Sequence, residues 1–176
     1  MADGTLKVGT ITTSSGSGTI TIPSGVTLSG GVGNTPAFEV NGDGQSAPSI
    51  PNNTETKVTF TNEIVDTDSA YNTSDGKFTP QVAGTYYCYG RITFNSTADF
   101  DEISIILKKN GTIFANTIGR NEFSNGLCAY GMQTFNGTSD YLELYCKHQS
   151  GGSTSLHSSF NNGAMCVFGA YKLIGV

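Results

Sequence analysis

The chain has 176 residues, a net charge of −5 and only 13% charged residues. It contains 23 glycines and no tryptophan, and its many threonine, serine, tyrosine and phenylalanine residues are typical of β-strands and turns. The nine lysines and arginines are scattered, and no segment reaches the roughly 18 apolar residues of a membrane-spanning helix. These features argue against nucleic-acid binding and membrane insertion.

Residues 1–35 contain no aromatic side chain, and within them Thr19–Gly30 alternates apolar and polar residues around a turn at Pro23–Gly25. This alternation predicts two short strands. Four apolar side chains form an edge that is too small for a core, and we expect it to dock on another protein or on its own copies: Ile20, Ile22, Val26 and Leu28. The alternative is a flexible leader. The first residues lack the apolar run of a signal peptide, which favours synthesis in a cytoplasm.

From residue 36 onward the sequence predicts strands separated by turns. Alternating or aromatic-rich runs predict strands at Pro36–Val40, Glu55–Thr61, Gly84–Phe94, Ile103–Leu107, Thr112–Ala115, Tyr141–Cys146 and Met165–Ile174. Asn110 and Gly111 predict a hairpin, because this pair suits the positive φ angles of a type I′ turn. No helical period occurs, so the sequence predicts an all-β sandwich or jelly roll over residues 36–176.

Several tyrosines are predicted to point away from the core. Side chains alternate faces along a strand, so Tyr86 and Cys88 point inward while their neighbours point outward. A sheet that is apolar on both faces must cover the second face, and head-to-tail contacts that close after three copies would do so. We expect four side chains to form this trimer interface: Tyr87, Tyr89, Tyr145 and Tyr171. The alternative is that they are scattered surface residues.

Few residues offer catalytic or metal-binding chemistry. His148 and His157 are separated by a glycine pair in a spacing that fits no metal or triad motif, so we expect both in solvated loops. The acidic loops at Asp66–Asp68 and Asp99–Glu102 could supply oxygens to calcium, but their spacing resembles no calcium loop. We therefore expect solvated acids, no cofactor and no enzymatic activity.

The four cysteines leave three alternatives open. Cys88, Cys146 and Cys166 lie in apolar runs, which favours buried free thiols. Two disulfides are the next alternative, since the number is even once Cys128 is included. Metal binding comes last, because no two cysteines are spaced as a zinc-binding pair.

Six positions in the strand region share a fixed spacing: Phe60, Asp66, Tyr71, Phe78, Gly84 and Tyr86. This spacing resembles the aromatic and glycine signature of the complement C1q-type globular domain. The hairpin at Asp101–Gly111 and the final Phe168–Leu173 are similar to the family as well, whereas Cys88 stands where the family has an aromatic residue. The resemblance implies a ten-stranded jelly roll that forms compact homotrimers, a fold shared with the tumour-necrosis-factor cytokines.

A second resemblance concerns the N-terminus. Gly4–Thr13 and Gly18–Leu28 resemble the N-terminal segments of small structural proteins from tailed bacteriophages. This implies a virion protein assembled in the bacterial cytoplasm, with residues 1–35 as an anchoring β arm and residues 36–176 as the trimeric domain. Such a subunit could decorate and cement the capsid or form a short tail fibre, and it could contact a glycan of the host surface. The alternative is a secreted, lectin-type C1q-like recognition protein.

Overall fold

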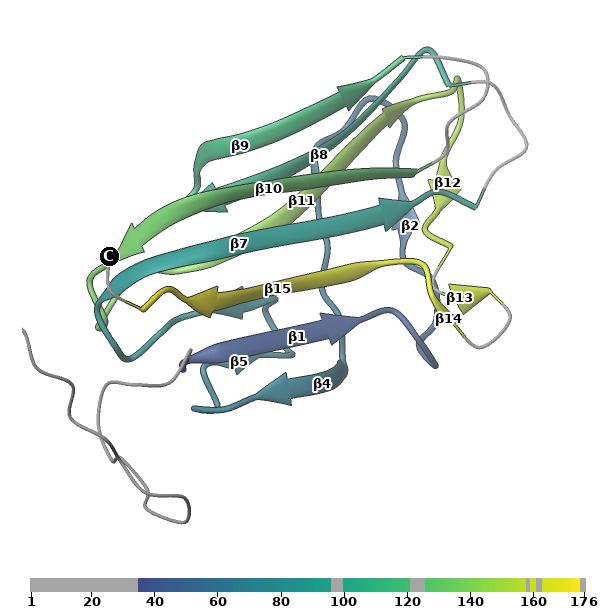
Figure 1. Cartoon of the computed structure of the whole chain (residues 1–176). Coiled ribbons are helices and arrows are strands. Elements are labelled where there is room, and N and C mark those ends of the chain that lie inside the picture. The colour runs from purple at the N-terminus through teal and green to yellow at the C-terminus, as the bar shows by residue number, and fades with distance from the viewer. Residues whose placement is uncertain (1–34, 96–99, 121–125, 158, 161–162, 175–176) are drawn as a thin grey trace, which may run out of the picture. The chain divides into compact units, whose positions relative to one another are not determined.

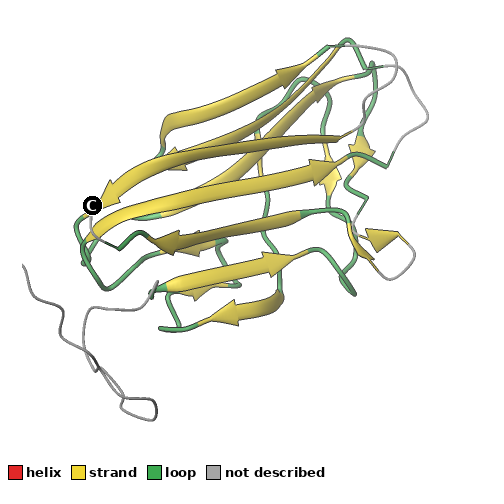
Figure 2. Ribbon diagram, viewed as in Figure 1, coloured by secondary structure: helices red, strands yellow, loops and turns green. Residues whose placement is uncertain are grey.

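The computed structural model describes residues 35–95, 100–120, 126–157, 159–160 and 163–174. The chain divides into two units, Met1–Val32 and Gly33–Val176, and all described residues belong to the second. The role predicted for the N-terminal arm stays a prediction. The described residues form strands, turns and loops (Figure 2), and among them there is no helix that could span a membrane.

Two antiparallel sheets pack face to face as two layers (Figure 1). Sheet I has the order β10-β7-β15-β1-β4 and consists of β1 (Ala37–Asn41), β4 (Asn62–Asp66), β7 (Gly84–Thr93), β10 (Gly126–Phe135) and β15 (Val167–Lys172). Sheet II has the order β5-β6-β11-β8-β9, with β3 also paired to β11, and consists of β3 (Thr56–Lys57), β5 (Tyr71–Asn72), β6 (Lys77–Phe78), β8 (Glu102–Lys109), β9 (Thr112–Gly119) and β11 (Leu142–Gln149). Two short pairs lie outside these sheets: β2 (Ser49–Ile50) with β12 (Thr154–Ser155), and β13 (Ser159–Phe160) with β14 (Gly163–Ala164).

The core between the sheets is built from aromatic rings. The Phe38 ring of sheet I stacks on Phe78 of sheet II at 4.1 Å between centroids, and Phe168 meets Phe38 edge-on at 5.0 Å. All three side chains are buried, and burial of each contributes roughly 1.5–3 kcal/mol to stability. Since these residues belong to three different strands, their packing fixes the two sheets against each other.

The predicted all-β jelly-roll sandwich is confirmed, with a strand number close to the ten expected. The hairpin formed by β8 and β9 turns at Asn110 and Gly111, whose φ angles of 51° and 77° are those that a type I′ turn requires. The predicted strand at Glu55–Thr61 is shorter than expected, since only β3 pairs, although Val58 and Phe60 are both buried. Among the strands that the sequence did not predict, β4 and β10 are the longest, and the others are the two-residue strands β2, β5, β6, β12, β13 and β14.

Candidate functional site: a tyrosine face on sheet I

The outward side of sheet I carries cross-strand rows of side chains that point away from the core. One row runs across β1, β15, β7 and β10 and consists of Ala37, Tyr171, Tyr87 and Met132. The next row on the same strands consists of Glu39, Gly169, Tyr89 and Tyr130. Cross-strand neighbours stand close enough to touch, so these rows form one continuous surface. We call it the tyrosine face.

The four tyrosines of this face form one cluster around Tyr87. The centroid of the Tyr87 ring lies 5.5 Å from that of Tyr171, 6.1 Å from Tyr89 and 6.3 Å from Tyr130. Tyr130 and Met132 are each 67% exposed, and they are the most exposed large apolar side chains among the described residues. The cluster is therefore a large aromatic surface open to water on one side.

Tyr89 is held in place by a strong hydrogen bond. Its hydroxyl donates to Oε2 of Glu39 across the intervening strand β15, at 2.6 Å. Burial, followed by this hydrogen bond, raises the pKa of Tyr89 well above its ordinary value of 10.0, so the hydroxyl is a proton donor at neutral pH. The ring can cross β15 because the residue beneath it is Gly169: a Cβ there would lie 2.5 Å from Cζ of Tyr89.

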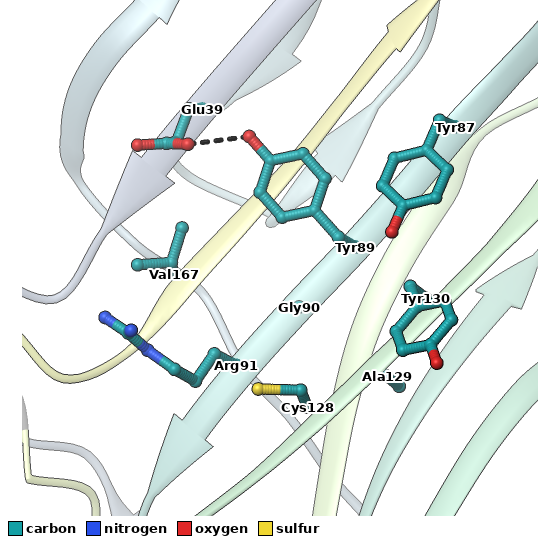
Figure 3. Close-up of a pocket in the computed structure, with 9 residues that line it drawn as sticks. All are labelled: Glu39, Tyr87, Tyr89, Gly90, Arg91, Cys128, Ala129, Tyr130 and Val167. Carbon is teal, nitrogen blue, oxygen red and sulfur yellow. Dashed lines mark hydrogen bonds between the residues drawn. The ribbon is translucent and has the colours of Figure 1, made fainter.

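A hollow of about 340 Å³ opens beside the cluster (Figure 3). It is lined by Glu39, Tyr87, Tyr89, Gly90, Arg91, Cys128, Ala129, Tyr130 and Val167. In the figure Glu39 and Tyr89 lie above Gly90, Arg91 and Cys128 lie below it, and Tyr87 and Tyr130 lie to the right. Arg91 donates from Nε to the carbonyl of Met165 at 3.2 Å and from a terminal nitrogen to the carbonyl of Ala164.

The two charged groups of this hollow are thus engaged within the chain, Glu39 by Tyr89 and Arg91 by two backbone carbonyls. The outward side of sheet II is different, because it carries ion pairs. Lys57 lies 2.7 Å from Glu143, and Lys108 pairs with Glu55. Sheet I therefore presents an aromatic surface, whereas sheet II presents ion pairs together with the exposed Ile113 and Ile118 of β9.

The prediction that Tyr145 belongs with the other tyrosines is wrong. Tyr145 points outward as its parity predicted, but it lies on β11 in sheet II, on the opposite side of the sandwich. Nζ of Lys108 lies 4.1 Å from the centroid of its ring, so the ring is covered by a cation. Tyr87, Tyr89 and Tyr171 do share one surface; whether it is an interface stays a prediction. No pattern in the sequence indicates that this surface also includes Tyr130, Met132, Glu39 and Gly169.

The six signature residues have architectural roles. Phe60, Phe78 and Tyr86 are fully buried or nearly so. The Asp66 carboxylate accepts hydrogen bonds from the backbone amides of Ala70 and Tyr71, at 3.0 and 2.8 Å, and the Tyr71 hydroxyl donates to the carbonyl of Phe60 at 3.2 Å. Gly84 has a φ of 153°, which L side chains rarely adopt. These residues fix the fold and leave no group directed at a ligand.

The expectation that both histidines lie in solvated loops is wrong for His148. This residue is on β11, 0% exposed, with its ring edge-on to Phe94 and Phe100. One ring nitrogen lies 2.9 Å from the carbonyl of Ile50 and the other 3.0 Å from Oγ of Ser150. Both nitrogens have polar partners, which explains how the core accommodates the ring. His157 is partly exposed outside the strands.

The remaining predicted residues divide into three groups. Cys88, Cys146 and Cys166 are buried, as predicted, whereas Cys128 is exposed on the tyrosine face, and all four are free thiols. Among the residues that the structure describes, no group of three metal-ligating side chains occurs. The arm residues lie outside the described residues: Ile20, Ile22, Val26 and Leu28.

Comparisons with known proteins agree with this fold. No curated protein matches the sequence. The globular domain of zebrafish complement 1qA is 18% identical and superposes with a TM-score of 0.51, covering 80% of this chain and 98% of its own. Murine APRIL at pH 5.0 is 12% identical with a TM-score of 0.58, covering 78% and 98%. At these identities the likeness shows the fold alone. The family model of the C1q domain matches residues 37–135, more than half of the sequence, and the chain therefore belongs to the C1q domain family.

Proposed function

We propose that this chain is a non-enzymatic binding subunit that associates as a homotrimer through its tyrosine face. The observation that carries the proposal is the cluster of Tyr87, Tyr89, Tyr130 and Tyr171 on the outward side of sheet I. A contiguous apolar patch of this kind is costly to leave in water, and aromatic residues are enriched at protein interfaces. Their hydroxyls can still reach water or a partner at the rim.

The distribution of charge supports a second copy as the partner. Each chain carries a net charge of −5, so copies repel each other unless they meet through a surface without net charge. On the tyrosine face the charges of Glu39 and Arg91 are opposite and each has a partner within the chain. Because the two charges have opposite signs, the face adds no net charge to the contact. A head-to-tail contact that closes after three copies would cover the face in every copy.

The proposal of a binding protein and not an enzyme is supported by His148. A general base must reach a substrate proton, and both nitrogens of this histidine are already bonded inside the core. The charged side chains of the hollow, Glu39 and Arg91, are likewise hydrogen-bonded within the chain, which suits association better than catalysis.

The test is the mass of the protein in neutral solution. Sedimentation equilibrium of the full chain should give the mass of three copies. Tyr87→Asp should give a folded monomer, because each copy would bury an unpaired carboxylate in the contact, at a cost of several kcal/mol. The matched control is Tyr145→Asp, which places the same charge on sheet II and should leave the trimer intact. A wild-type monomer, or equal dissociation by both variants, would contradict the proposal.

For the biological setting, we infer a virion subunit of a tailed phage, made and assembled in the bacterial cytoplasm. The support is the resemblance of Gly4–Thr13 and Gly18–Leu28 to phage structural proteins, and the apolar edge that ends at Leu28. In this proposal residues 1–35 anchor the trimer to capsid or tail, and the domain faces outward, where a host glycan could be contacted.

Deletion of residues 1–33 tests this setting independently of the trimer. The truncated protein should remain a soluble trimer of nearly unchanged thermal stability that no longer incorporates into particles. Normal incorporation, or failure to fold, would contradict the anchoring role.

Intact-mass analysis of native protein should show free thiols and an unmodified chain. Disulfides or glycans would instead favour the secreted recognition protein.

A further inference from the structure

Tyr89 is the residue of the tyrosine face whose orientation is fixed by two independent features. The first is its hydrogen bond to Glu39, at 2.6 Å, which spans the width of β15. The second is the absence of a side chain at Gly169, where a Cβ would lie 2.5 Å from Cζ of the ring and 2.8 Å from the carbonyl oxygen of Phe38. A real Cβ essentially never approaches heavy atoms so closely, so any other residue at 169 would displace the ring.

This orientation shapes the hollow. In Figure 3 the Tyr89 ring points toward Glu39, away from Tyr130 and Cys128, and the backbone at Gly90 lies between them. On the far side Arg91 is fixed to the carbonyls of Ala164 and Met165. The hollow of about 340 Å³ is therefore formed before any partner arrives, because both of its polar walls are fixed by bonds within the chain.

We propose that this hollow is a preformed socket for an apolar side chain of a second copy, and that Glu39 and Gly169 are positioning residues that hold it open through Tyr89. The inference rests on the proposed trimer and assigns its specificity. A second copy fits because its own outward surface offers exposed apolar side chains such as Tyr130 and Met132, each 67% exposed. Glu39 and Arg91 have opposite charges and are each hydrogen-bonded within the chain, so the hollow has no net charge that would select a charged occupant.

The decisive variant is Tyr89→Phe, which keeps the ring and removes only the hydroxyl. The bond already exists in the isolated chain, so its loss weakens association by letting the ring leave its position. A socket that is then open about one tenth of the time loses about tenfold per site, and three sites multiply to about a thousandfold loss in the trimer association constant. Glu39→Gln keeps an accepting oxygen and should lose much less than Glu39→Leu. The matched control is Tyr145→Phe on sheet II, which should leave the association constant unchanged.

Sedimentation equilibrium gives the association constant, and urea unfolding of dilute protein gives the stability of the single chain. A positioning role and a purely structural role both predict some loss of single-chain stability, because the bond between Tyr89 and Glu39 exists in the isolated chain. Only a positioning role also predicts a large loss of the association constant. It also predicts that Tyr89→Phe and Glu39→Leu together cost no more than either alone, because each removes the same bond.

The outcomes separate this inference from the proposed function. If wild type is a monomer, the trimer proposal fails and the inference with it. If wild type is a trimer and Tyr89→Phe associates as tightly, the socket is not held by Tyr89 and only the inference is overturned. An equal loss of association in Asp66→Ala, which lowers single-chain stability without touching the tyrosine face, would also overturn it, as a purely structural effect. Gly169→Ala should weaken association as well, and if it fails to fold, Tyr89→Phe alone decides.

Discussion

Buried cysteines make the protein sensitive to alkaline pH. The effect can be worked out for two of the three that are 0% exposed, Cys88 and Cys146. Burial raises the pKa of the Cys88 thiol from its ordinary value of 9.0 to about 12, and burial followed by the nearby Cys166 does the same for Cys146. In the unfolded chain both thiols ionise near pH 9.0, whereas in the folded chain they stay protonated until about pH 12. Ionisation between these values therefore favours the unfolded chain.

The direction and the size of the change in the free energy of unfolding follow from the difference between the folded and unfolded pKa values. The stability that depends on the buried thiols is fully present below pH 9.0 and is lost as the pH rises toward 12. At pH 10, one unit above the unfolded value, each thiol lowers the free energy of unfolding by about 1.4 kcal/mol, so that the two together lower it by about 3 kcal/mol. Against a typical stability of roughly 5–15 kcal/mol this is a large change.

Urea unfolding of reduced protein at pH 8 and pH 10 measures the effect. Cys88→Ala should be less stable than wild type at pH 8, because it leaves a cavity, but its loss between pH 8 and pH 10 should be smaller by about 1.4 kcal/mol. The control is Cys128→Ala, which removes an exposed thiol and should show the wild-type pH dependence. An identical pH-dependent loss in wild type and Cys88→Ala would refute the reasoning.

Two further predictions test burial and the family signature. In folded, dilute protein a thiol reagent should label Cys128 at once and the other three cysteines only after unfolding, as read by intact mass, and trimer formation should slow the labelling of Cys128. Asp66→Ala should lower the free energy of unfolding by about 1–3 kcal/mol, because two backbone amides lose their acceptor, while the association constant measured by sedimentation should change little.

The strands with a regular pattern could be predicted from the sequence, and β10 shows why others could not. Its outward residues are Cys128, Tyr130 and Met132, and its inward residues include Ala129 and Gly131. Small inward and large apolar outward side chains remove the alternation on which strand prediction depends. The small inward residues are explained by close packing, since a Cβ on Gly131 would lie 3.4 Å from both Ala115 and Phe114.

The tyrosine face could be predicted only in part, because parity tells which way a side chain points and not to which sheet its strand belongs. Tyr87, Tyr89 and Tyr171 point outward from neighbouring strands of sheet I, whereas Tyr145 points outward from sheet II. The hydrogen bond between Tyr89 and Glu39 joins residues 50 positions apart, and no local pattern in either strand indicates it. His148 was misjudged for a similar reason, since its partner Ile50 lies 98 residues away.

The signature residues and the tyrosine face are separate features of the same strands. Tyr86 and Cys88 of β7 point into the core, while Tyr87 and Tyr89 of the same strand point out. A chain can therefore keep every signature residue, and hence the sandwich, while its outward residues change freely. Gly169 is an exception, because it affects both the core and the tyrosine face. It lies next to Phe168 of the core, and its missing side chain makes room for the Tyr89 ring. A relative with a side chain at this position would have to place the ring at position 89 differently and would form a different socket, so copies of the two chains should not mix.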